Sequence, residues 1–170
     1  MNKEIILKDF RDTFSALINS IAAFDDESFN TVPFENSWTA GQVGQHLILA
    51  NTGFAAVLNA KVKDTDRKID ELVARLQADF LNFDIKMQSP DFIHPEKKDY
   101  NKADQLAKMK EIEEVTIKEI AVLDLSKTCL AFELPGYGFL TRLEAIYFVI
   151  YHTQRHTQQL NRIHNAIKHP

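Results

Sequence analysis

The sequence predicts an all-α protein, a four-helix bundle with a long crossover connection and a short extra helix. Its 170 residues include only five glycines and five prolines, so turns should be few and helices long. Apolar residues recur every three or four positions over several long segments, as on one face of a helix. Hydrophobic residues make up 45% and charged residues 26% of the chain, which is the balance of a globular protein. A chain of this length fits one domain, residues 1–170.

The first half of the chain predicts two long helices. The first should cover residues 2–24, where apolar side chains follow the helical spacing. Residues 25–37 are rich in acidic residues and asparagine and predict a loop. The second helix should cover residues 40–61, because Thr39 and Gln42 form a capping box that satisfies its first free backbone amides.

The second half begins with a short helix expected over residues 69–81 and a crossover loop with two prolines over residues 86–99. A third long helix should follow over residues 101–123, because Asn101 can cap it. Residues 129–139 contain one proline and two glycines, and predict an irregular, partly buried connection to the last helix.

The last helix carries two histidines in an otherwise apolar stripe. Thr141 and Glu144 form a second capping box at its start, and it should continue to about residue 167. His152 and His156 are four residues apart, so their imidazoles lie about 40° apart around the helix axis, one turn above the other. Two buried imidazoles without a function would need hydrogen-bond partners, whereas two stacked nitrogen ligands can bind one metal ion.

A third histidine lies on the inward face of the second helix. His46 occupies the middle of that apolar stripe, and the small residues Ala50 and Gly53 further along the helix predict a substrate pocket beside it. Three imidazoles with one open coordination position are what a catalytic metal site requires. Gln159 either lines this site or faces solvent or an interface. The glycines at 41, 44 and 53 each cost about 1 kcal/mol relative to alanine, so they indicate a close helix contact or room for a ligand.

The other candidates have simpler interpretations. His94, in a loop between prolines, should be solvated, and His164, about 120° from the proposed face, should lie on its flank or on the surface. His169 lies at the chain end. Trp38, just before the capping box, should be a hydrophobic staple. Cys129 should be a small core residue.

Composition restricts the partners. The net charge of −4 argues against a nucleic-acid surface, which needs clustered positive charge. No stretch has the roughly 18 consecutive apolar residues of a membrane span, and the N-terminus has no secretory h-region. The single cysteine cannot form an intramolecular disulfide, which favours a cytoplasmic protein.

Two segments, SWTAGQVGQHLILA and YHTQRHTQQLNRI, resemble the DinB/YfiT-like superfamily of metalloenzymes. The signature W-(S/T)-x-x-x-(I/V)-x-x-H-L is matched by Trp38, Thr39, Val43, His46 and Leu47. The resemblance covers essentially the whole chain and implies the same three histidines as ligands of zinc or nickel. Characterised members use low-molecular-weight thiols such as bacillithiol or mycothiol. The resemblance also implies a homodimer formed through the outer faces of the bundle.

The leading hypothesis is therefore a metal-dependent enzyme that hydrolyses a small electrophilic substrate or transfers a low-molecular-weight thiol to it. No carboxylate or further histidine stands out as a general base. One alternative is a non-catalytic helical bundle that binds a small ligand or acts in a stress response, with a structural metal or none. A second is a buried network of polar histidines without a metal.

Overall fold

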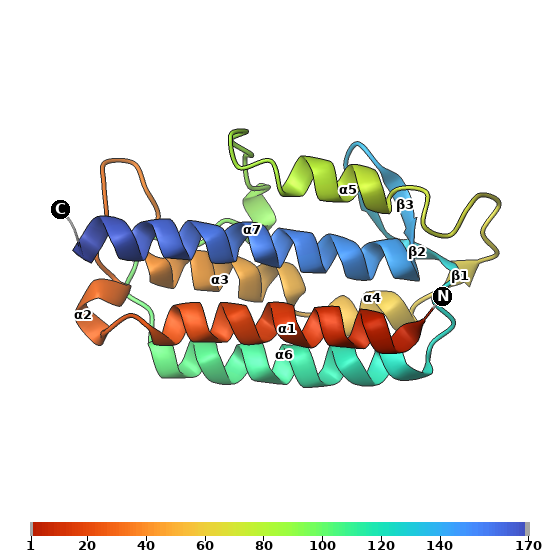
Figure 1. Cartoon of the computed structure of the whole chain (residues 1–170), viewed down its shortest axis with the longest axis horizontal. Helices are drawn as coiled ribbons and strands as arrows, with labels where there is room; N and C mark the ends of the chain where they lie inside the picture. Colours follow the sequence, from red (N-terminus) through yellow and green to blue (C-terminus); the bar gives the residue numbers. More distant parts are fainter. Residues whose placement is uncertain (1, 169–170) are drawn as a thin grey trace.

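The computed structural model, which describes residues 2–168, is a four-helix bundle, as the sequence predicts (Figure 1). The long elements are α1 (Lys3–Ala22), α3 (Ala40–Asn51) with its continuation α4 (Phe54–Asn59), α6 (Lys102–Val122) and α7 (Arg142–Lys168). Helix α1 packs against α6 and α7, and α3 packs against the same two helices, so the four surround a common core. None of the helices formed by residues 2–168 has the length and apolar character that a membrane span requires.

The single helix predicted over residues 40–61 is wrong, because the structure divides it. Thr39 and Gln42 form the expected capping box. Helix α3 then ends at Asn51, and Gly53 adopts a left-handed conformation with φ of 86° before α4 begins. Only glycine adopts this conformation without strain, so Gly53 serves a turn and not a helix contact.

The other two glycines of this segment do mark close helix contacts. A Cβ atom on Gly44 would lie 2.0 Å from Gln105 Oε1, and one on Gly41 would lie 2.7 Å from Asn30 Oδ1. Gln105 also donates a hydrogen bond of 2.9 Å to the Gly41 carbonyl. The glycines therefore allow α3 to approach the start of α6.

Residues 129–139 form part of a β-hairpin, which corrects the expected irregular connection. Strand β2 (Thr128–Leu134) pairs antiparallel with β3 (Gly138–Thr141), and β1 (Val62–Lys63) pairs with β2 on its other edge. Gly136, with φ of 82°, lies in the turn between β2 and β3. The proline and glycines that indicated irregular backbone thus belong to a tight turn.

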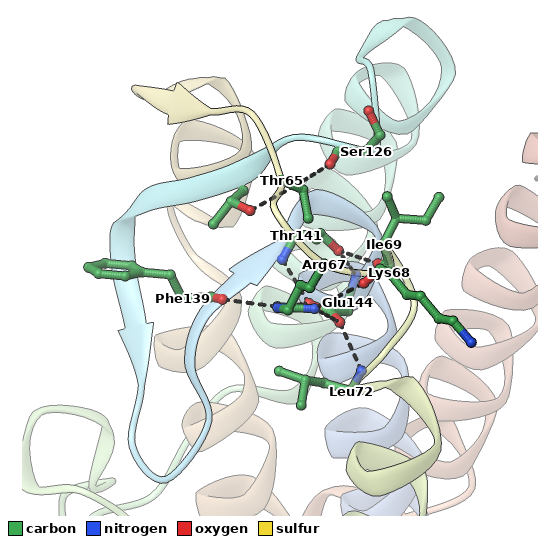
Figure 2. A network of polar contacts seen from close by, with 10 residues as sticks. Thr65, Arg67, Lys68, Ile69, Leu72, Ser126, Phe139, Thr141 and Glu144 are labelled. Atoms are coloured by element: carbon green, nitrogen blue, oxygen red, sulfur yellow. Dashed lines mark hydrogen bonds and ion pairs between the residues drawn. The ribbon is translucent and has the colours of Figure 1, made fainter.

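A buried carboxylate joins this hairpin to the start of α7 (Figure 2). Glu144 is fully buried and accepts hydrogen bonds from the backbone N–H groups of Thr141 and Leu72, both at 2.9 Å. Arg67 donates two more, at 2.5 and 2.7 Å. Burial raises the pKa of Glu144, but these hydrogen bonds outweigh it and hold the pKa below its usual value. Glu144 of the second capping box therefore also binds the segment from Arg67 to Leu72.

Shorter elements surround the bundle. Helix α5 (Val73–Phe80) packs on the outer side of α7, and α2 (Asp26–Phe29) lies in the first loop. The crossover from α5 to α6 contains one short 3-10 helix, η1 (Asp91–Ile93), which contacts α3. Asn101 caps α6 by accepting from the Asp104 N–H at 3.1 Å, as predicted. The crossover thus passes over the face of the bundle formed by α3 and α7.

The histidines interrupt the apolar core along α7. One buried apolar cluster includes the α7 residues up to Tyr151, and a second one includes Leu160 and Ile163. His152 and His156 lie between these two clusters. The core therefore contains a polar section at mid-bundle.

Candidate metal centre

Three histidines from two helices converge in this polar section. His46 on α3 is 2% exposed and His152 on α7 is 8% exposed, while His156 is half-buried. The Nε2 atom of His152 lies 3.2 Å from His46 Nε2 and 3.1 Å from His156 Nε2. The structure thus brings together the three histidines that the sequence singled out, with the same ring nitrogen of each facing the others.

Hydrogen bonds on the far side of two rings determine which nitrogen carries the proton. His46 Nδ1 lies 2.9 Å from the backbone carbonyl of Ile93, which can only accept. His156 Nδ1 lies 2.8 Å from Gln159 Oε1. Both Nδ1 atoms therefore donate, and both Nε2 atoms present lone pairs to the cluster. Gln159 therefore contacts a histidine of the cluster through its side-chain oxygen.

His152 lacks such a partner. Its Nδ1 atom is buried and has no hydrogen-bond partner within residues 2–168. Its Nε2 atom lies between two lone pairs and, as a donor, can satisfy only one of them at a time. At the meeting point of the three rings, at least one nitrogen lone pair thus has no hydrogen-bond donor and is available to bind a cation.

Burial keeps all three imidazoles neutral at ordinary pH. It lowers the pKa of His46, and it lowers the pKa of His152 well below the usual value. Burial, and after it the repulsion that a protonated His156 would meet from a protonated His46, lowers the pKa of His156 to about 3. Neutral imidazole is the form that binds a metal.

The donor set fits one divalent ion. Nitrogen ligands at about 2.0–2.1 Å from a tetrahedral ion lie about 3.3–3.4 Å apart, close to the two Nε2 separations of 3.1 and 3.2 Å. Histidine ligands usually donate their second ring N–H to a carbonyl or another acceptor, as His46 and His156 do here. Among the described residues no carboxylate or thiolate joins the three histidines as a fourth ligand.

Comparison with known proteins places the chain in a family. A sequence model of the DinB superfamily matches residues 6–160. The chain belongs to the DinB superfamily. A search of solved structures finds TT2238, a four-helix bundle protein, with a TM-score of 0.60 and 20% sequence identity over 95% of this chain and 99% of that one. At this identity the likeness shows the fold alone. No curated protein matches the sequence significantly.

Aromatic rings enclose the histidines of this DinB superfamily member. The Phe148 ring stacks on His152 with centroids 5.6 Å apart, and Phe80 meets His152 edge-on at 6.0 Å. The Trp38 ring lies 5.2 Å from His46 and 5.4 Å from His94. Trp38 packs against the second apolar cluster, as a staple does, but it also contacts the site. His94 is exposed, as expected, yet it lies beside Trp38 at the edge of the site.

The crossover is held to the site from both ends. At one end, the Arg155 guanidinium donates to the carbonyl of Phe80 at 3.1 Å, to that of Asn82 at 2.8 Å, and to that of Ile85. At the other end, the Ile93 carbonyl accepts from His46. Arg155 lies between the two α7 histidines in sequence, so one turn of α7 both presents site histidines and anchors the crossover.

The remaining sequence candidates lie on several elements of the fold. Gly53 lines a cavity of about 120 Å³ between the α3–α4 turn and α6, and no histidine lines that cavity. Ala50 is half-buried on α3. His164 lies edge-on to Phe24, with ring centroids 5.1 Å apart. His169 lies outside the described residues.

Two contributors to the site were missed from the sequence. The Ile93 carbonyl belongs to the backbone of the short helix η1 in the crossover, so no residue type indicates its role. Arg155 lies between the two α7 histidines in the sequence, and no role was predicted for it. An arginine between two inward-facing histidines can still indicate such a role. Its guanidinium lies close to a buried site and therefore needs hydrogen-bond acceptors there.

Proposed function

We propose that this chain is a metal-dependent enzyme in which His46, His152 and His156 hold one divalent ion, zinc or nickel. The observation that carries the proposal is the convergence of three Nε2 atoms within hydrogen-bonding distance while two of the opposite Nδ1 atoms donate to protein acceptors. Membership of the DinB superfamily and the three-histidine cluster both fit a divalent metal.

The residues around the cluster have defined roles in this proposal. Gln159 and the Ile93 carbonyl hold the imidazoles in the ligating tautomer. Phe148 and Trp38 restrict water on two sides of the site. A divalent ion with an open coordination position would supply Lewis acidity, which lowers the pKa of a coordinating water or thiol so that it can ionise near neutral pH.

The proposed reaction is hydrolysis of a small electrophilic substrate, or transfer of a low-molecular-weight thiol to it. The absence of a fourth protein ligand among the described residues supports an open position. The proposal also includes a cytoplasmic location, no nucleic-acid partner, and a homodimer formed through the outer bundle faces.

Metal analysis of the purified protein tests the ligand assignment. The wild type should bind one equivalent of zinc or nickel, and His46→Ala and His156→Ala should each lose it. His164→Ala is the matched control, because His164 is a half-buried histidine on α7 outside the cluster. A wild type that binds no stoichiometric metal under any loading condition would overturn the site, and variants that keep the metal would overturn the ligands.

Catalysis needs its own test. Metal-loaded wild type is incubated with a panel of electrophiles, each with water alone and with a low-molecular-weight thiol, and His46→Ala is the control. Turnover that depends on His46 supports the enzyme. Stoichiometric metal without turnover of any substrate would favour a non-catalytic bundle that binds a small ligand or acts in a stress response.

A further inference from the structure

A second hollow lies on the side of α7 away from the histidines. It is a groove of about 430 Å³ whose floor is formed by Tyr147, Ile150, Tyr151 and Gln154 of α7. These four residues lie about 100° to 200° around the helix axis from His152. Asp9, Asp12, Thr13 and Ala16 of α1 form one wall, and Gln77 of α5 contributes to the other.

The groove follows from how α5 and α1 are arranged. Both helices pack against α7, on either side of it in Figure 1. Between them the surface of α7 is recessed and forms the floor of the groove. Two stacked tyrosines, Tyr147 and Tyr151, form part of this floor, with ring centroids 5.7 Å apart and an interplanar angle of 23°.

The hydroxyl groups distinguish these tyrosines from the other two in the chain. Tyr100 donates to the Glu96 carbonyl at 3.0 Å, and Tyr137 donates to Asp79. Neither Tyr147 nor Tyr151 has a hydrogen-bond partner among residues 2–168, although Tyr151 is only 7% exposed. The Tyr151 hydroxyl oxygen is not fully enclosed by protein atoms. Because Tyr151 lines the groove, we infer that the hydroxyl is exposed there. A nearly buried tyrosine normally finds a partner for its hydroxyl.

The charge of the groove is negative. Asp9 is half-buried and forms no ion pair among the described residues. Asp12, at the outer rim, pairs with Lys8. Burial, and after it the charge of Asp9, raises the pKa of Tyr147; burial, Tyr147 and Asp9 raise that of Tyr151. Both phenols therefore stay neutral, with electron-rich rings next to an unpaired carboxylate.

We propose that this groove binds a small organic ammonium ion that carries a hydroxyl or another hydrogen-bonding group. Asp9 supplies the charge opposite to that of the cation, and the half-buried Tyr147 ring at the groove floor adds a cation–π attraction. The Tyr151 hydroxyl pairs with the polar group of the ligand. Gln154 donates its amide hydrogen to Thr13 at 3.3 Å, which leaves its carbonyl oxygen as a further acceptor. This site does not depend on the metal, because its residues lie on the other side of α7.

A pair of isosteric probes tests the charge requirement. Choline and its uncharged carbon analogue 3,3-dimethylbutan-1-ol have almost the same shape, and each is titrated into the isotope-labelled full chain by NMR. Choline should shift the signals of α1 and α7 residues lining the groove in a saturable manner, and the neutral alcohol should not. Equal binding of both probes, or binding of neither, would overturn the proposal.

Variants locate the binding. Asp9→Asn and Tyr151→Phe should each weaken choline binding by about two- to fivefold, the range expected for the loss of one partly exposed ion pair or one hydrogen bond. Asp99→Asn is the matched control, because Asp99 is exposed and lies before α6, outside the groove. An affinity unchanged by both groove variants would overturn the proposal, as would a dimer whose interface covers the groove.

Discussion

Replacing Gln159 by leucine is expected to weaken metal binding without removing a ligand. Gln159 Oε1 accepts the His156 Nδ1–H at 2.8 Å, and this bond keeps the proton away from Nε2. Leucine has a similar size but no acceptor. His156 then loses a hydrogen bond worth about 0.5–1.5 kcal/mol, and the non-ligating tautomer becomes populated.

The size of the effect follows from this geometry. Loss of an outer partner of a histidine ligand typically lowers metal affinity by about 10- to 100-fold, or about 1.4–2.7 kcal/mol. Because His46 keeps its own acceptor on Ile93, we expect the lower end, about tenfold. The affinity for zinc is measured at fixed pH by competition with a chromophoric chelator.

Gln158→Leu is the control, because within residues 2–168 this neighbouring glutamine has no hydrogen bond to a histidine, unlike Gln159. It should keep the wild-type affinity. If Gln159→Leu binds zinc within about twofold of wild type while His156→Ala does not bind it, the argument about the tautomer is refuted and His156 remains a ligand.

Three further predictions concern the frame around the site. Arg67→Ala should lower the free energy of unfolding in urea by about 3 kcal/mol, because it leaves the buried Glu144 carboxylate without its ion pair; a loss below about 1 kcal/mol would mean that the pair behaves as a surface one. Metal-free protein should lose stability as the pH falls from about 6.5 to about 3, because the folded state depresses the pKa of His156 and holds it neutral; the unfolding free energy of His156→Gln, measured across the same range, should fall less steeply. Arg155→Gln should speed tryptic cleavage after Lys86 by about tenfold or more, since the crossover loses charged hydrogen bonds to three carbonyls; an unchanged cleavage rate would show that Arg155 does not hold the crossover.

Local signals predicted most of the helical fold correctly. The capping boxes at Thr39 and Thr141 place the starts of α3 and α7, because such boxes satisfy backbone amides within four residues of sequence. The prediction of one helix over residues 40–61 was wrong because a glycine at position 53 is compatible with both a close helix contact and a left-handed turn. Only the backbone conformation separates the two, and it depends on what surrounds the residue.

The hairpin was missed for a related reason. A proline and two glycines within eleven residues are compatible with both irregular backbone and a tight turn between strands. Strand β2 also pairs with β1, which is about 65 residues earlier in the chain, and no local pattern contains that contact.

The three histidines on inward helix faces were determined by the sequence alone, because helical periodicity assigns a direction to each side chain. Only the tertiary structure decided that their Nε2 atoms meet, since that depends on how α3 and α7 pack. The acceptors that orient two of the rings show the same division. Gln159 is three residues from His156 and was visible as a candidate, whereas the Ile93 carbonyl reaches His46 from the crossover, 47 residues away. A backbone carbonyl has no side-chain identity to detect, so only the folded chain reveals it.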